Sequence, residues 1–450
     1  MVDRELIITR CDQVMFCAVC GLAWFIPISI ALVEWMFGIG LLAWLIKRGT
    51  IFKALMEEEG AGGWGGQARL LLLSFKPKHG ALNRPLLVFL AVVIVSALLG
   101  FSPLKSLSAV LTKVLQWVMT YVIVLEAVTT RKHVRVIGLV LLASAALISI
   151  NGLVQYSTGT GFIRQRTVID GRRVMSTFRH PNDFAGWLTI ILPTVFSLSF
   201  IQFFRARQGR DAFLEGSDRS GFLQSTAFIA ISFAVLALAG VCLGLTYSRG
   251  GWLATGVALL IATARQPRIL VPLLVAGAVF LGVFAVRMVS DRTTNIGGSM
   301  KNVFTNVSDR NTIWSEGLQL VRERPLLGIG FNNYLQTVKE RGNKRQEYAH
   351  NCYLQMAAET GIAGLLAFLW IPVSLFREGL RQLPRVRDRF PHHLLLGLLT
   401  GTGAFLLHSF FDTNFYSTQL SSLLWLAVGL IPAIPRSEGQ EPPPGPSHSA

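Results

Sequence analysis

The chain has 450 residues, of which 52% are hydrophobic and only 15% are charged, and its mean hydropathy is +0.49. About twelve membrane-spanning segments of about 20 residues each would use roughly half of such a chain, which excludes an ordinary soluble enzyme, a disordered chain and a disulfide scaffold. The net charge of +17 would suggest nucleic acid in a soluble protein. In a membrane protein the same surplus is typical of cytoplasmic loops.

Apolar runs along the chain predict an all-α fold, a polytopic transmembrane bundle of about twelve helices. The runs lie at 14–27, 29–46, 85–101, 104–128, 134–154, 184–204, 224–245, 251–264, 268–289, 351–376, 393–412 and 418–434. The first two runs are short and meet at Pro27, so they could form a single hairpin. The expected number of helices is therefore about ten to twelve.

The basic residues between these runs predict the orientation of the chain. Every second connection is basic, beginning with Lys47 and Arg48 after the second run. Because cytoplasmic loops are enriched in Lys and Arg, both termini are expected to be cytoplasmic. The Pro-rich residues 435–450 are predicted to form a disordered cytoplasmic tail behind a transmembrane domain at 1–434.

Two outer connections are basic as well, against this rule. They lie at about 155–183 and about 290–350, and the longer one carries nine basic residues against six acidic ones. One interpretation is that loops of this length cross the membrane regardless of charge. The other is an electropositive outer face for an anionic ligand such as phosphate, which Arg matches with two parallel hydrogen bonds.

The longer outer loop is predicted to contain an amphipathic helix on the outer leaflet. Apolar residues recur there at helical spacing, namely Ile313, Trp314, Leu318 and Val321. Ser308 and Asp309 are expected to cap this helix, and Pro325 marks its end. Trp314 and Tyr334 suit the level of the lipid headgroups.

Three segments place polar residues at the outer ends of apolar runs: 178–186, 246–252 and 348–353. Arg249 stands between two apolar runs, where an unpaired guanidinium is costly. It either reaches the lipid headgroups or binds a lipid diphosphate, with Gly250 beside it allowing close backbone approach. Arg179 allows the same two interpretations.

His350 precedes a predicted helix, whose dipole favours a neutral imidazole that could accept a proton from an attacking hydroxyl. Interfacial hydrogen bonding is the alternative, and His180 competes for the catalytic role.

His408 and Asp412 are four residues apart, so they are expected to share one helix face and either line the cavity or satisfy each other. The further residues expected to line the site are His180, Asn182, Asn351, His408 and Asp412. The sequence has no acid pair or His/Cys cluster with metal-ligand spacing, so we expect no metal and no cofactor.

At these motifs the chain resembles the O-antigen ligase and O-antigen polymerase superfamily of bacterial envelope glycosyltransferases. The matching elements are His180 to Gly186, Tyr247 to Gly250, Arg310 to Phe331, His350 to Leu354 and Glu359 to Gly364. The resemblance covers roughly 180–375, and the flanks fit only by hydropathy.

The resemblance implies metal-independent, inverting transfer of a glycan from an undecaprenyl-diphosphate carrier to an acceptor hydroxyl. The reaction would take place at the periplasmic face of the bacterial inner membrane, where Arg179 and Arg249 would bind the diphosphate and His350 would activate the acceptor. The acceptor would be a glycan, lipid A-core or a protein hydroxyl. Membrane lipids are the other expected partners, and nucleic acid is not one.

Two other classes of function stay open at this stage. A lipid-linked glycan flippase or transporter would need polar residues along a path through both leaflets, whereas the polar motifs gather on one side. A non-catalytic envelope scaffold would not need His350.

Overall fold

The computed structural model describes residues 4–59, 64–75, 80–169, 173–201, 223, 225–264, 266, 268–271, 274, 277, 282, 312–342 and 347–438. The helices that build the bundle are α1 (Arg4–Phe25), α2 (Ile30–Glu59), α4 (Asn83–Leu99), α7 (Arg131–Thr158), α8 (Pro181–Ser199), α10 (Thr226–Leu245), α11 (Arg249–Thr263), α15 (Cys352–Gln382), α16 (Arg389–His408) and α17 (Thr418–Ser437). A further continuous helix consists of α5 (Pro103–Ala109), the π-helical turn η1 (Val110–Val114) and α6 (Leu115–Ala127).

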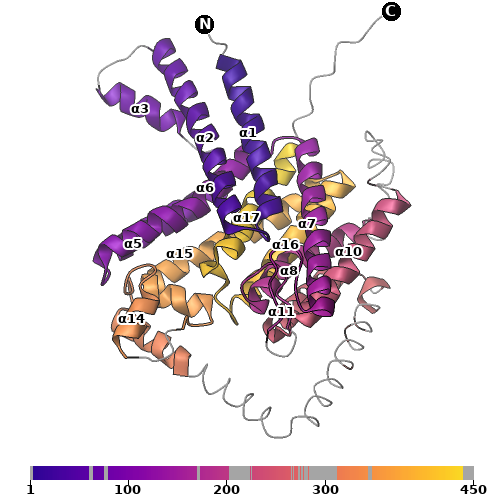
Figure 1. Cartoon of the computed structure of the whole chain (residues 1–450). Coiled ribbons are helices and arrows are strands. Elements are labelled where there is room, and N and C mark those ends of the chain that lie inside the picture. Colours follow the sequence, from indigo (N-terminus) through magenta and orange to yellow (C-terminus); the bar gives the residue numbers. More distant parts are fainter. Residues whose placement is uncertain are drawn as a thin grey trace, which may run out of the picture.

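The predicted all-α membrane bundle is confirmed (Figure 1). Within the described residues, eight helices are long and apolar enough to cross a membrane, and α4 is a shorter apolar helix. Eleven of the twelve predicted runs coincide with helices, while most of the run at 268–289 lies outside the described residues. The first two runs are separate long helices, α1 and α2, so they do not form a single short hairpin.

Local capping explains where several helices begin. Pro181 opens α8 three residues before the predicted run, because proline has no N–H to lose at the first helical position. Ser248 caps α11 and Asp388 caps α16 through side-chain oxygens that accept backbone N–H groups. Residues 64–74 form the short helix α3 (Trp64–Ser74).

Helix α8 lies at the centre of the half of the bundle that carries the predicted site residues, and it packs against α16. A Cβ atom at Gly397 would come within 2.6 Å of Thr194 Cα, and one at Gly401 within 2.5 Å of the Ile190 carbonyl oxygen. These two glycines therefore allow the backbones of α8 and α16 to touch, as small residues do in membrane helix pairs. Elsewhere Trp117 of α6 stacks on Trp425 of α17, with 6.0 Å between ring centroids.

Buried ion pairs gather at the pole of the bundle that was predicted to be cytoplasmic. Lys47 of α2 donates to Asp12 at 2.6 Å, and Arg48 pairs with the buried Glu126 at the end of α6. At the same pole Arg135 of α7 pairs with Asp388 at 2.5 Å. Glu438 and the starts of α7 and α16 meet there too, because Arg131 pairs with Glu438 at 3.3 Å. The charges at this pole thus largely satisfy one another.

The longer outer loop is folded at the opposite pole, below the bundle in Figure 1. A helix at 312–323 confirms the predicted amphipathic element, and α14 (Tyr334–Glu340) follows it. Ile313 and Leu320 are buried, whereas Leu318, which was predicted to share the apolar face with Ile313, is exposed. The expected caps Ser308 and Asp309 lie outside the described residues. Tyr334 does not lie at the headgroup level as predicted, because it is fully buried in a small apolar cluster under the loop.

Helix α17 extends three residues beyond the predicted end of the transmembrane domain at 434. The remainder of the predicted tail, residues 439–450, lies outside the described residues.

Candidate active site

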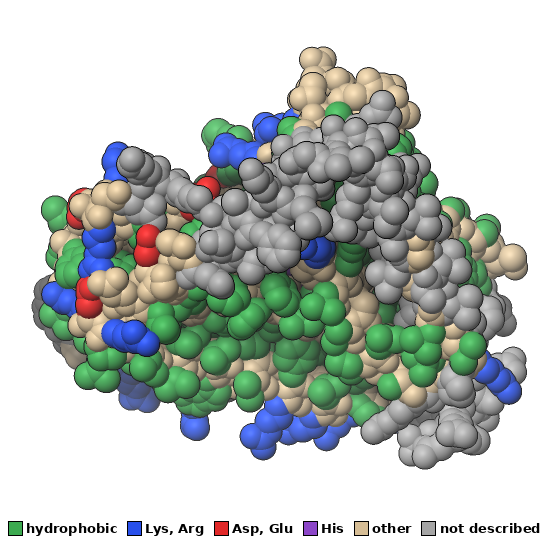
Figure 2. All heavy atoms as spheres, turned by 90° about the horizontal axis from the view of Figure 1, so that it is seen from below, with side chains coloured by type: hydrophobic (Ala, Val, Ile, Leu, Met, Phe, Trp, Pro, Cys, Tyr) green, Lys and Arg blue, Asp and Glu red, His purple; other side chains and the backbone are tan. Residues whose placement is uncertain are grey.

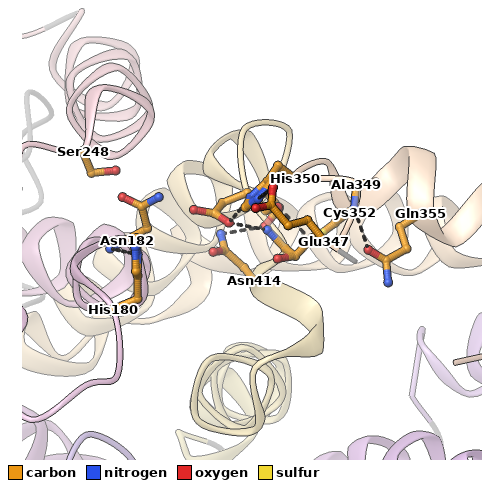
Figure 3. A network of polar contacts seen from close by, with 12 residues as sticks. His180, Asn182, Ser248, Glu347, Ala349, His350, Cys352, Gln355 and Asn414 are labelled. Atoms are coloured by element: carbon orange, nitrogen blue, oxygen red, sulfur yellow. Dashed lines mark hydrogen bonds and ion pairs between the residues drawn. The ribbon is translucent and has the colours of Figure 1, made fainter. Parts of the chain in front are cut away.

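The three polar segments predicted from the sequence meet at one pole of the bundle. Their meeting point is the turn between α16 and α17, which contains η3 (Asn414–Tyr416). Figure 3 shows His180, Asn182 and Ser248 on one side of this turn and His350 with Asn414 at its centre. Ser248 and His408, which are 160 residues apart in sequence, are joined by a hydrogen bond, and His350 is joined to Asp412 in the turn.

His350 is held by Asp412. Its Nδ1 lies 3.3 Å from Asp412 Oδ1, and its Nε2 lies 3.9 Å from the carboxylate of the exposed Glu347. His350 has φ +47°, a left-handed conformation that is costly for a residue with a side chain. Backbone strain of this kind persists only where the surroundings fix it, and it is concentrated at functional sites.

Asp412 is a buried carboxylate that stays ionised. Burial alone would raise its pKa, but the hydrogen bond from His350 and the nearby charges of His408 and His350 hold the pKa well below its usual range. The backbone N–H of Thr413 also donates to Oδ1, at 2.8 Å. A fixed anion next to Nδ1 keeps a proton on that nitrogen, which leaves Nε2 as the basic position.

A second histidine ties the Ser-Arg-Gly segment to the same turn. His408 is buried, its Nε2 lies 3.4 Å from Ser248 Oγ, and its Nδ1 accepts from Asn414 Nδ2 at 3.0 Å. Gly250 is needed for this contact, because a Cβ atom there would come within 2.9 Å of Phe411 and 3.2 Å of His408. The position of Arg249 is thereby fixed relative to His350.

Arg173 joins the other two segments. Its Nε donates to the carbonyl oxygen of Thr246 at 2.9 Å, and its Nη2 donates to Asn182 Oδ1 at 2.9 Å. The start of α8 and the turn before α11 are therefore held in register by one guanidinium. The sequence did not single out Arg173, because its charge alone does not reveal this role.

The outer arginines divide into two kinds. Arg164 donates to the Ile28 carbonyl oxygen at 3.1 Å and Arg166 to the Thr177 carbonyl oxygen at 3.1 Å, so both support the loop. Arg179 and Arg249 are exposed and form no hydrogen bond or ion pair with the described part of the chain. The pKa of Arg166 is lowered by burial and by repulsion from Arg164 and Arg179, which shows that positive charge is concentrated here.

Seen from below, this pole shows more Lys and Arg than Asp and Glu among its described residues (Figure 2). Asp183 is the acid close to this cluster: it is attracted by Arg179 and repelled by Asp412. This excess of basic side chains among the described residues supports the predicted electropositive face, which stays a prediction.

Three predicted lining residues also have local structural tasks. His180 caps α8 by accepting from the backbone N–H of Asn182 at 3.2 Å, and Asn182 receives Arg173. Asn351 Oδ1 accepts from the N–H groups of Tyr353 and Leu354, both at 3.0 Å, and so caps α15 directly after His350. His350 contacts the carboxylate of Asp412, whereas His180 caps α8. This difference favours His350 over His180 for the catalytic role.

The predicted relation between His408 and Asp412 needs correction. Helix α16 ends at His408, and Asp412 lies in the turn that follows, so the two do not share a helix face. The chain leaves the helix because Phe410 and Phe411 donate to the carbonyl oxygens of Leu407 and His408 in a tighter turn. His408 thereby reaches Ser248 while Asp412 reaches His350.

Glu359 is a site residue that sequence reasoning did not single out. It is buried in α15, and its carboxylate accepts from the backbone N–H of Asn332 at 2.9 Å and of Tyr334 at 3.3 Å, and from the Tyr416 hydroxyl at 2.9 Å. Gln355 bridges from it to the segment of His350, donating to Glu359 at 3.4 Å and accepting from the Ala349 N–H at 3.4 Å. A Glu inside an apolar run was the available signal.

Among the described residues, no three His, Cys, Asp or Glu side chains are placed to hold a metal ion. The expected independence from metals stays a prediction, which a chelator can test.

Residues 234–369 match the model of the O-antigen ligase family. The predicted resemblance to this superfamily is thereby confirmed. The matched segment carries Ser248, Arg249, His350 and Glu359, whereas Arg179 and Asp412 lie outside it.

The chain is also similar to the exopolysaccharide production protein ExoQ of Rhizobium meliloti (strain 1021), with 27% identity over 154 residues. The alignment covers 32% of this chain and 34% of ExoQ, so the chain spans about a third of the length of that relative. Together with the apolar helices, the two matches identify a multi-pass membrane protein related to the O-antigen ligases.

Proposed function

We propose that the protein transfers a glycan from an undecaprenyl-diphosphate carrier to an acceptor hydroxyl at the periplasmic face of the inner membrane. The observation that carries this proposal is the contact between His350 Nδ1 and Asp412 at 3.3 Å, beside two exposed arginines. The relation to O-antigen ligases and to an exopolysaccharide production protein supports glycan transfer in general.

In the proposed reaction His350 is the general base. Because Nδ1 is engaged by Asp412, Nε2 is the nitrogen that would accept the proton of the acceptor hydroxyl. The acceptor oxygen forms a bond to the anomeric carbon, and the bond from that carbon to the carrier phosphate breaks. The electron pair leaves with undecaprenyl diphosphate, and attack from the opposite face inverts the anomeric centre.

Arg179 and Arg249 would bind the departing diphosphate. Charge accumulates on the phosphate oxygens as the bond breaks, so guanidiniums fixed in advance stabilise the transition state more than the bound substrate. Arg179 and Arg249 form no hydrogen bond or ion pair with the described residues, so their guanidiniums can bind phosphate. Arg164 and Arg166 already donate to backbone carbonyl oxygens. The apolar surface of the bundle would accommodate the polyprenyl tail.

The proposal is tested in cells that lack the protein and are complemented with variants. His350→Ala and Arg249→Ala should each lower the amount of transferred glycan by at least about a hundredfold. They should also cause undecaprenyl-diphosphate-linked glycan to accumulate on the periplasmic leaflet.

The matched control is Arg322→Ala, which removes an exposed arginine from the outer helix and should leave transfer intact. Full transfer by His350→Ala would contradict the catalytic role. Accumulation of the lipid-linked glycan on the cytoplasmic leaflet would point to a flippase instead.

A further inference from the structure

A second cluster of polar and aromatic side chains lies beside His350 and has no task in the transfer described above. It consists of Lys113, Asn332, Tyr348 and Tyr416, which are all half-buried. The rings of Tyr348 and Tyr416 are 5.7 Å apart and inclined by 31°. Lys113 Nζ donates to Asn332 Oδ1 at 3.0 Å.

The cluster is held from beneath by Glu359. Its buried carboxylate accepts both from the Tyr416 hydroxyl and from the Asn332 N–H, each at 2.9 Å. Asn332 is fixed with φ +64°, a conformation that an unconstrained asparagine would leave. The exposed parts of the cluster are therefore presented in one rigid arrangement, as a binding site requires.

Lys113 reaches the cluster through an irregularity in its helix. Val110–Val114 form a π-helical turn between α5 and α6, and Lys113 lies within it. Such turns are rare and are found frequently at functional sites. A half-buried lysine in a membrane helix is also expensive unless it is used.

The sequence neighbours of the two arginines, His180 and Ser248, lie on the other side of His350 from Gln355, which bonds to the carboxylate beneath the cluster (Figure 3). In an inverting transfer the attacking hydroxyl approaches the sugar from the face opposite the leaving group. With the diphosphate on the arginine side, the acceptor has to approach from the side of the tyrosines.

We infer that Lys113, Asn332, Tyr348 and Tyr416 form the subsite for a sugar ring of the acceptor glycan. The aromatic rings offer apolar faces to the C–H groups of the sugar, and the tyrosine hydroxyl of Tyr348, the ammonium and the amide offer hydrogen bonds to its hydroxyl or carboxylate groups. Tyr348 forms no hydrogen bond through its hydroxyl with the described chain, so this group is available. The inference rests on the proposed function.

The test is a kinetic comparison with the full-length protein in nanodiscs. The acceptor probe is a repeat-unit oligosaccharide released from the host's own surface polysaccharide, and the donor is undecaprenyl-diphosphate-linked glycan. Lys113→Gln and Tyr348→Ala should each raise the KM for the acceptor about tenfold, with kcat and the donor KM changed by less than about twofold. Lys105→Gln, which removes an exposed lysine from the same helix, is the matched control and should leave both KM values unchanged.

A second arm measures binding of the same oligosaccharide to the protein without donor. Binding should weaken about tenfold in Lys113→Gln and Tyr348→Ala and stay unchanged in Lys105→Gln. An unchanged acceptor KM, an equal loss in Lys105→Gln, or an effect on the donor alone overturns the subsite while transfer itself stands. Binding without any transfer by the wild-type protein would instead contradict the proposed function.

Discussion

At the scale of single residues, the site depends on pairs that fix one another. Asp412 holds Nδ1 of His350, and Ser248 meets His408. Arg249 is left with an exposed guanidinium between these pairs and the solvent. The arrangement concentrates basic and cationic groups at a single point of an otherwise apolar molecule, which suits a reaction that takes up a proton and releases a diphosphate.

Asp412→Asn tests whether the carboxylate orients the base. The amide keeps the shape but removes the charge that selects the tautomer of His350, so transfer should fall by at least about a hundredfold. Because the pKa of Asp412 lies below its usual range, the wild-type carboxylate is ionised throughout the neutral range, and raising the pH should not restore the variant. The measurement is kcat of the purified variant from about pH 6 to about pH 9.

Glu340→Gln, at the exposed end of α14, is the control for loss of a carboxylate at the same pole and should keep the wild-type rate. A normal kcat in Asp412→Asn would mean that His350 does not need this partner.

His350, Arg179 and Arg249 could be selected from the sequence because a titratable or charged residue at the edge of an apolar run is costly. The residues that contact them could not be selected from the sequence. Asp412 was expected on the same helix face as His408, and only the end of α16 at His408 separates the two. The positions of Asn414 and Arg173 depend on turns, and contacts between distant segments set the geometry of these turns. The spacing of apolar residues along the chain does not indicate such contacts.

At the scale of elements, the outer loop and α15 interlock at a kink. Gly361 has φ +70° inside α15, and the N–H of Ile362 donates to the Pro325 carbonyl oxygen at 2.8 Å. Gly328, with φ +66°, lies against the backbone of Glu359, and the N–H of Gly330, with φ +97°, donates to the Glu359 carbonyl oxygen at 2.9 Å. The Cβ of any other residue at Gly361 would clash with the Leu326 carbonyl. The loop that leads to the subsite is thus anchored by a contact between backbones.

Gly361→Ala should therefore destabilise the protein by more than about 2 kcal/mol, because it adds both a clash and a strained left-handed conformation. The thermal unfolding midpoint in detergent and the rate of proteolysis in the outer loop measure the effect. Gly240→Ala in α10 is the matched control: a Cβ there meets nothing within 4 Å, and alanine is favoured over glycine in a helix interior. Equal stability of the two variants would contradict the interlock.

Length and hydropathy predicted most of the helices to within a few residues, whereas α1 begins ten residues before its predicted run and α2 ends thirteen residues after its own. The contact between the outer loop and α15 could not be predicted. The sequence showed Leu327-Gly328-Ile329-Gly330 only as part of a family motif, and it did not show that these glycines pack against α15. The amphipathic helix at 312–323 was predictable because apolar residues recur in it at helical spacing. The burial of Tyr334 was not, because it depends on the fold of the loop.

At the scale of the whole molecule, charge is used differently at the two poles. Lys47, Arg48 and Glu126 form paired groups at one pole, where the basic residues were attributed to membrane insertion. The other pole exposes Arg179 and Arg249 beside His350. The net charge of +17 is thus the sum of an orientation signal and a candidate binding surface.

The central claim is most directly tested by single-turnover transfer with the purified protein in liposomes. The donor is radiolabelled glycan on undecaprenyl diphosphate, the acceptor is the repeat-unit oligosaccharide, and EDTA is present throughout. We expect labelled product and free undecaprenyl diphosphate from the wild-type protein, and neither from His350→Ala folded to the same extent. Product formation that is abolished by EDTA, or equal in His350→Ala, would contradict metal-independent transfer with His350 as the base.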